Sequence, residues 1–202
     1  AVAVKSGRSV YYAGLFVRPE SAVRTIGDLR GKRVAFGDIN STSAFVFPVA
    51  MFLDAGIDPA RDLSAVRMTG THANSLAALV NGEVGAAALS FDSYDKAVRA
   101  DVPGVRDLRV VARSGPIPYP PLIANTRLAP AVRARLRSAF ENISRTPGIT
   151  PEMIRGYGGA QVDGYTGVLP AGHFDPAARK MAQVGPALKG EMLRKAAERP
   201  AR

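Results

Sequence analysis

The sequence contains no cysteine and no tryptophan among its 202 residues. Without cysteine the chain can form neither disulfides nor thiolate metal sites. No window reaches the roughly eighteen uninterrupted apolar residues of a membrane span, and the first ten residues, AVAVKSGRSV, lack the apolar centre of a signal peptide. An exported protein has this character after processing. With 47% hydrophobic residues, the chain can bury a core as one domain or two small lobes.

Negative charge is scarce in the second half of the chain. The formal net charge is +10, of which residues 111–202 carry +8 and residues 1–110 only +2. The basic residues of the second half alternate with Ala, Leu and Met, which is typical of solvated amphipathic helices. A nucleic-acid interface usually adds exposed aromatics or a recognisable module. We find neither, so we expect no nucleic-acid partner, whereas small anions are attracted to such a surface.

Short apolar runs alternate with helical patterns. The predicted strands are Tyr11–Val17, Arg33–Phe36, Ala65–Met68, Ala86–Phe91, Leu108–Ala112 and Leu122–Ala124. The predicted helices are residues 25–30, Ser43–Ala55, His72–Asn81, Asp92–Ala100 and Pro130–Ser144. This alternation indicates an α/β fold with a largely parallel sheet. The proline-dense stretch Arg113–Pro121 is the best candidate for a connection between lobes, and residues from about Gly190 are expected to form a frayed helical tail.

The hydroxyl triplet Ser41-Thr42-Ser43 lies between the strand RVAF and the apolar helix that follows it. The first N–H groups of such a helix lack intrahelical partners and form a natural anion site. Three adjacent hydroxyls add donors without adding charge. A single Ser acting as N-cap, with two incidental hydroxyls, accounts for the local pattern equally simply. The triplet alone therefore leaves both interpretations open.

Two further polar residues follow neighbouring predicted strands. His72 comes after Ala65–Met68, and Asp92 comes after the next strand. In open α/β sheets, ligands bind beyond the carboxyl ends of strands. A lone His is more often a surface or capping residue, but three successive strand ends with polar residues favour a shared site. Serine, histidine and aspartate are also the parts of an acyl-transfer triad, which makes a serine hydrolase using Ser41 or Ser43, His72 and Asp92 an alternative. The G-x-S-x-G motif is missing.

Several segments resemble one protein family. YYAGLFVRPESAVRTIGDLRGKRVAFGDINSTSAFVFP, GTHANSLAALVNGEVGAAAL and LRVVARSGPIPYPPL occur in the order typical of phosphate, phosphite and phosphonate solute-binding proteins of ABC transporters, and GHFDPAARKMAQV follows. The resemblance covers nearly all of residues 11–185. It implies a periplasmic-binding-protein-like fold of type 2, with two α/β lobes and a ligand cleft between them. It also implies a non-enzymatic protein without cofactor or metal that passes its ligand to an ABC permease.

The resemblance assigns roles to individual residues. Ser41, Thr42, Ser43 and His72 would hold a phosphonate, phosphite or phosphate-type oxyanion, Tyr11 would line the cleft from the other lobe, and Asp92 would face the ligand's substituent. Residues 25–110 would form the lobe with the anion site. Residues 1–24 and 111–202 would form the remnant of an incomplete first lobe with C-terminal helices.

The chain also departs from the family pattern. The family's glycine after the triplet is Ala44, and the usual acidic residue near the end of the second segment is Gly85. A related oxyanion of arsenic or sulfur therefore remains an alternative ligand. We expect a monomer that is periplasmic, or extracellular and membrane-associated. An oxyanion sensor that partners a membrane histidine kinase would share the same fold and site.

Overall fold

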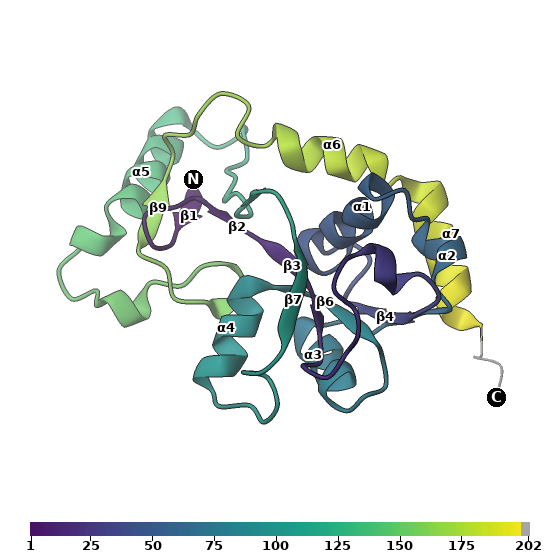
Figure 1. Cartoon of the computed structure of the whole chain (residues 1–202). Coiled ribbons are helices and arrows are strands. Elements are labelled where there is room, and N and C mark those ends of the chain that lie inside the picture. Colours follow the sequence, from purple (N-terminus) through teal and green to yellow (C-terminus); the bar gives the residue numbers. More distant parts are fainter. Residues whose placement is uncertain (199–202) are drawn as a thin grey trace. The chain divides into compact units, whose positions relative to one another are not determined.

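The computed structural model describes residues 1–198 and divides the chain into two compact units (Figure 1). The first unit contains Ala1–Tyr11 and Pro118–Asp175, and the second contains Tyr12–Ile117 and the residues from Pro176 onward. The two-residue strands β2 (Val10–Tyr11) and β8 (Ile117–Pro118) lie where the chain passes between the units. Within the described residues, none of the helices has the length and apolar character needed to cross a membrane.

The second unit is built on a five-stranded sheet. Its strands are β3 (Ala13–Val17), β4 (Arg33–Phe36), β5 (Ala65–Met68), β6 (Ala86–Ser90) and β7 (Arg109–Arg113), arranged in the order β5-β4-β6-β3-β7. Strand β4 runs parallel to β5 and β6, whereas β3 runs antiparallel to both β6 and β7. The sheet is therefore mixed, and β3 is the exception to the largely parallel arrangement expected from the sequence.

Helices follow most strands of this sheet. They are the 3-10 turn η1 (Gly27–Leu29), the π-helical turn η2 (Thr42–Val46), α1 (Phe47–Asp54), α2 (Pro59–Asp62), α3 (His72–Val80), α4 (Phe91–Arg99), α6 (Asp175–Gln183) and α7 (Pro186–Ala197). Helix α1 ends at the turn containing Gly56, whose φ of +70° favours glycine because a side chain is strained in that region. The helix predicted over Ser43–Ala55 therefore ends within one residue of its expected end.

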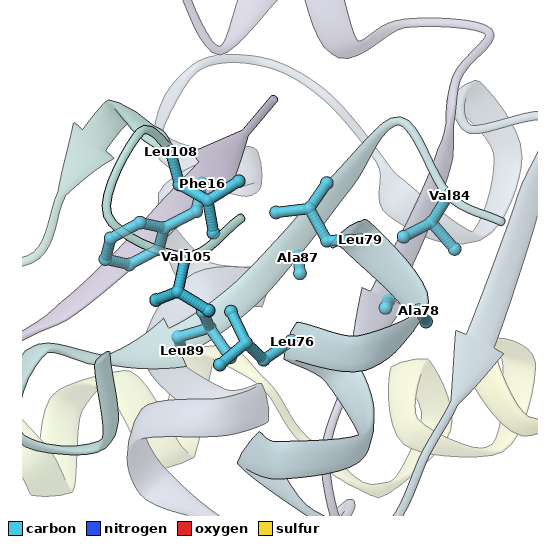
Figure 2. Close-up of a cluster of buried hydrophobic side chains, with 10 residues drawn as sticks. Phe16, Leu76, Ala78, Leu79, Val84, Ala87, Leu89, Val105 and Leu108 are labelled. Atoms are coloured by element: carbon cyan, nitrogen blue, oxygen red, sulfur yellow. The ribbon is translucent and has the colours of Figure 1, made fainter. Parts of the chain in front are cut away.

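The two faces of the sheet carry separate apolar layers. Successive residues of a strand point to opposite faces, and on β4 Phe36 packs against Phe45 and Phe52 of the η2–α1 segment. Its neighbour Ala35 belongs instead to the cluster beneath α3. Figure 2 shows that cluster, in which Phe16, Leu76, Leu79, Val84, Ala87, Leu89, Val105 and Leu108 meet. The helices after β4 and β5 thus cover opposite faces, and both begin at the same edge.

The first unit has less regular structure. Its strands β1 (Val2–Val4) and β9 (Gly164–Thr166) pair antiparallel, and its helical elements are α5 (Pro130–Glu141) and the short turns η3 (Ile143–Arg145), η4 (Pro151–Met153) and η5 (Tyr157–Gly159).

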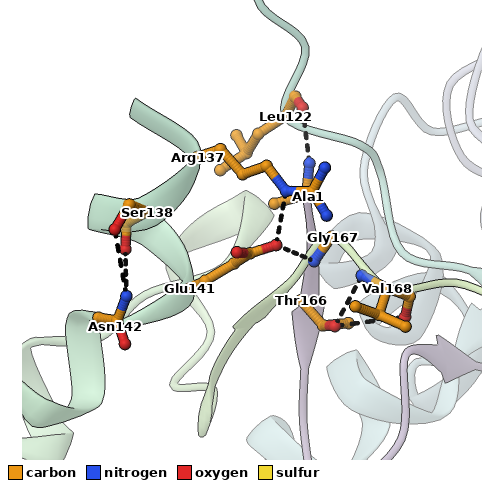
Figure 3. A network of polar contacts seen from close by, with 9 residues as sticks. All are labelled: Ala1, Leu122, Arg137, Ser138, Glu141, Asn142, Thr166, Gly167 and Val168. Carbon is orange, nitrogen blue, oxygen red and sulfur yellow. Dashed lines mark hydrogen bonds and ion pairs between the residues drawn. The ribbon is translucent and has the colours of Figure 1, made fainter. Parts of the chain in front are cut away.

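Side-chain hydrogen bonds connect α5 to β9. Glu141 accepts from the backbone N–H of Gly167 at 3.0 Å and from Arg137 Nε at 2.9 Å (Figure 3). The chain start is held nearby, since the amino group of Ala1 donates to the Leu122 carbonyl at 3.1 Å. The Glu141 carboxylate thus links α5 to the residue that follows β9.

The structure confirms the predicted strands Arg33–Phe36 and Ala65–Met68 to the residue. Three other expectations differ. Leu122–Ala124 forms no strand. The expected frayed tail from about Gly190 is helical over its described part, because α7 continues to Ala197 and buries Met192 completely, and residues 199–202 of that tail lie outside the described residues. The unit boundaries also lie elsewhere than the expected 1–24, 25–110 and 111–202, because β3 is a central strand of the second unit's sheet.

Candidate functional site

Three parallel strands of the second unit end at one edge of its sheet. The segment that starts with Ser41 follows β4, α3 follows β5 and begins at His72, and α4 follows β6. The convergence expected from the sequence is therefore present in the chain topology. Two helix N-termini and the hydroxyl triplet meet at this edge, where the unpaired N–H groups of a first helical turn favour anions.

Ser41 caps the helical segment that follows β4. Its backbone is extended, and its Oγ accepts a hydrogen bond from the N–H of Ala44 at 3.1 Å. Its carbonyl accepts from the N–H groups of Phe45 and Val46 at 3.1 and 3.0 Å, and this double acceptance produces the π-helical first turn. Ser41 is thus the N-cap that one interpretation of the triplet expected, and its hydroxyl oxygen already accepts a hydrogen bond.

Ser43 has a different environment. Its side chain is buried, and its Oγ lies 3.3 Å from Nε2 of His72. The other ring nitrogen, Nδ1, accepts a hydrogen bond from the backbone N–H of Ser90 at 3.2 Å. The imidazole of His72, which follows β5, therefore joins Ser43, which follows β4, to Ser90, which ends β6.

The Ser90 contact determines the tautomer of the ring. A backbone N–H can only donate, so Nδ1 of His72 must be unprotonated, and a neutral ring then carries its hydrogen on Nε2. Nε2 donates this hydrogen to Ser43 Oγ, which leaves the Ser43 hydroxyl hydrogen to be donated elsewhere. Burial lowers the pKa of His72 below its ordinary value, which favours this neutral form.

The same tautomer argues against a hydrolase. In an acyl-transfer triad the Nε2 atom accepts the serine proton, while Nδ1–H donates to a carboxylate. Here Nδ1 of His72 accepts from a backbone amide and Nε2 is the donor. The imidazole is thus oriented as a hydrogen-bond donor toward Ser43 rather than as its general base.

The remaining predicted residues occupy three different settings. Thr42 is half-buried in the first turn of η2, and its hydroxyl makes no hydrogen bond within residues 1–198. Asp92 is half-buried in the first turn of α4, two residues beyond Ser90. Tyr11 ends β2 in the first unit and stacks on the ring of Tyr119, with centroids 5.0 Å apart. The structure therefore brings Ser43 and His72 into contact and places Tyr11 in the other unit.

Sequence reasoning missed Ser90 and Gly37. Ser90 was predicted only as part of a strand. Its Oγ also caps α4 by accepting from Ser93 N–H at 3.1 Å, and the serine spacing is visible in the segment SFDS.

Gly37 follows β4, and a Cβ on it would lie 2.5 Å from the Cβ of Ala44. Gly37 N–H also donates to the Ala44 carbonyl at 3.0 Å. The glycine thus lets the strand exit pass directly against the helix start that carries Ser43.

Comparison with known proteins gives a consistent picture. Residues 1–171 match a family model described as ABC transporter, phosphonate, periplasmic substrate-binding protein. The phosphonates-binding periplasmic protein of Escherichia coli K12 is 28% identical over 145 residues, which is 70% of this chain and 43% of that protein. A phosphate-import protein of Mycolicibacterium smegmatis is 32% identical over 137 residues, which is 63% of this chain and 42% of that protein. The chain thus spans less than half the length of either relative.

The fold also has solved counterparts. A binding-protein component of an ABC phosphonate transporter from Pseudomonas aeruginosa superposes with a TM-score of 0.68 at 18% identity. The match covers 97% of this chain and 68% of that one. At this identity the similarity concerns the fold alone.

Proposed function

Because the chain belongs to the family of periplasmic substrate-binding proteins of ABC phosphonate transporters, we propose that it binds a tetrahedral oxyanion of the phosphonate, phosphite or phosphate class. Its fold is of the type 2 periplasmic-binding-protein kind. The ligand would be held at the carboxyl edge of the second unit's sheet and passed to an ABC permease in the membrane.

The observation that carries this proposal is the contact between Ser43 and His72. The Ser90 N–H holds the imidazole so that it donates to Ser43 Oγ, and the Ser43 hydroxyl then has a hydrogen left for a ligand oxygen. A buried hydroxyl whose oxygen already accepts one hydrogen bond and whose hydrogen is available suits an oxyanion, which offers acceptors only when fully ionised. Such preorganisation reduces the cost of ordering the site on binding.

The surrounding backbone supplies further donors. The N–H groups of Thr42 and Ser43 belong to the first turn of the continuous η2–α1 segment, and the N–H groups of His72 and Ala73 belong to the first turn of α3. First-turn N–H groups have no intrahelical acceptor and lie at the positive end of the helix dipole. Together with the Thr42 hydroxyl, they would meet the negative charge without requiring a positively charged His72.

Tyr11 and Asp92 enter the proposal on the family resemblance. Tyr11 would contact the ligand from the first unit, and Asp92 would face the substituent on phosphorus. The location follows in the same way, since the family is periplasmic. The protein would act there as a monomeric carrier without enzymatic activity.

Calorimetric titration of the purified chain with phosphate, phosphite, methylphosphonate and 2-aminoethylphosphonate tests the proposal. At least one of them should bind, and Ser43→Ala should weaken that binding about 10- to 100-fold because a charge-assisted hydrogen bond is lost. Ser144→Ala, in the first unit's η3 turn, is the matched control and should leave the affinity unchanged.

Two results would contradict the proposal. One is a folded sample that binds none of the four anions. The other is stoichiometric covalent labelling by a serine-directed phosphonate ester, because that would indicate an activated nucleophile rather than an anion seat.

A further inference from the structure

Arg113, the last residue of β7, is held by two aromatic rings. Its guanidinium carbon lies 4.0 Å from the centroid of the Tyr12 ring and 5.1 Å from that of Phe91. Cation–π attraction of this kind favours a guanidinium over a ring face and restricts the side chain. A long, exposed arginine is thereby kept in a defined place.

This arginine lies at the same sheet edge as the Ser43–His72 pair. Because β3 runs antiparallel to β6 and β7, its first residues lie beside the last residues of those two strands. The Phe91 N–H donates to the Tyr12 carbonyl at 3.0 Å, and Ala13 lies opposite Ser90. Gly14 lies opposite Arg113. Arg113 is therefore two strand spacings from Ser90, or about 10 Å at the backbone.

Gly14 has no side chain, which leaves room for the Phe91 ring beneath Arg113. A Cβ on Gly14 would lie 2.8 Å from Cε2 of Phe16 and 3.1 Å from Cε2 of Phe91. The ring of Phe91 thus occupies the volume that a side chain on β3 would fill. Phe91 in turn contacts Phe16, with ring centroids 5.4 Å apart, so the platform under Arg113 is continuous with the core.

The donors of Arg113 are not used inside the described chain. Within residues 1–198 its guanidinium makes no hydrogen bond or ion pair, and the side chain is exposed. Arg109, on the same strand, is the contrast: its guanidinium donates to the carbonyls of Pro19, Ser21 and Val23. Arg109 therefore holds a loop, whereas Arg113 is positioned without a structural acceptor.

We propose that Arg113, stacked on Tyr12 and Phe91, is a second anion subsite that binds a carboxylate on the ligand's substituent. A guanidinium matches a carboxylate with two parallel hydrogen bonds. The ligand would then be a phosphonate whose substituent carries a carboxylate toward Arg113, while the phosphonate group is held at Ser43 and His72. This inference rests on the proposed function and names its ligand class.

Asp92 is another charged side chain that the chain places near this end of β6. A carboxylate there favours a cationic substituent, such as the ammonium group of an aminoalkylphosphonate. The two residues therefore make opposite predictions about the substituent's charge, and the test must separate them.

The test is calorimetric titration of the 202-residue chain at pH 7.5 with 3-phosphonopropionate, propylphosphonate and 2-aminoethylphosphonate. The first two differ mainly in the carboxylate, so their affinity ratio reports on the subsite. We expect 3-phosphonopropionate to bind at least about tenfold more tightly than propylphosphonate, because a charge-assisted bidentate pair is gained. We expect 2-aminoethylphosphonate to be the weakest.

Variants assign the preference to Arg113. Arg113→Gln should reduce the affinity ratio to about one and change propylphosphonate affinity by less than about twofold, since only the carboxylate contact is lost. Arg113→Lys should retain part of the preference, because it keeps the charge without the planar fork. Arg106→Gln, an exposed arginine before β7 that pairs with Asp101, controls for the loss of one positive charge. Thermal unfolding of each variant confirms that it is folded.

Each outcome has a distinct meaning. If none of the three phosphonates binds the folded chain and phosphate and phosphite also fail to bind, the proposed function itself is contradicted. If phosphate or phosphite binds but the phosphonates do not, only the subsite is contradicted. If propylphosphonate binds but 3-phosphonopropionate has no advantage, or if Arg113→Gln leaves the advantage intact, only the subsite is contradicted. Preference for 2-aminoethylphosphonate that disappears in Asp92→Asn would assign the substituent to Asp92 and overturn the role of Arg113.

Discussion

Ser43 Oγ and His72 Nε2 lie 3.3 Å apart and join the first turns of two helices that cover opposite faces of one sheet. The contact depends on a third element, because the N–H at the end of β6 holds the far side of the imidazole. One ring thus couples the ends of three parallel strands. A change in the protonation of this ring should therefore affect all three strand ends. The first prediction concerns that protonation.

The stability of the chain should depend on pH through His72. Burial lowers the pKa of His72 in the folded state below 6.5, so the unfolded chain binds a proton at a higher pH than the folded chain does. The free energy of unfolding should therefore be level above about pH 6.5 and fall as the pH drops below it toward the lowered folded pKa. Protonation of Nδ1 would also break the bond from Ser90.

Urea unfolding measured between pH 8 and 5 checks this prediction. His72→Gln should remove the decline in that range, and His173→Gln, which changes the chain's other histidine, serves as the control. A decline that persists in His72→Gln would show that another group is responsible.

Ser41→Ala should cost about 1 kcal/mol of stability, since the N-cap bond to Ala44 N–H is lost. Thr42→Val is the matched control, because the Thr42 hydroxyl makes no hydrogen bond within residues 1–198. It should cost less than about 0.5 kcal/mol. Chemical denaturation of both variants makes the comparison, and equal losses would refute the cap role of Ser41.

Gly37→Ala should destabilise the chain by about 1–3 kcal/mol, because the new methyl group would overlap the Cβ of Ala44. Ala44→Gly alone should cost up to about 1 kcal/mol as a helix-interior glycine. The double variant should be more stable than the sum of the single losses predicts, since removing one methyl makes room for the other. A double-mutant cycle measures this coupling, and strict additivity would show that the two positions do not compete for space.

Met192→Ala should cost about 2–5 kcal/mol, because this side chain of α7 is fully buried and its removal leaves a cavity. Its neighbour Leu193 is 46% exposed and provides the control. Leu193→Ala should cost clearly less. If both changes cost little, α7 would contribute no core packing, as a frayed tail would.

Local patterns predicted much of the second unit. Strands β4 and β5 were predicted from short apolar runs, and the end of α1 from the helical pattern Ser43–Ala55. These features depend on neighbouring residues and on hydrophobic periodicity, both of which are visible along the chain. The expected strand at Leu122–Ala124 failed because three apolar residues do not specify a partner strand, and here the Leu122 backbone bonds to Ala1 instead.

The sequence by itself determined the α/β alternation, the order of polar residues at successive strand ends and the family to which the chain belongs. Only the tertiary structure decided the direction of β3, the tautomer of His72 and the stacking of Arg113 on Tyr12 and Phe91. Each of the latter depends on atoms from segments far apart in the chain, such as the Ser90 amide facing a ring eighteen residues away. Such contacts arise from pairing and packing, and no local pattern encodes them.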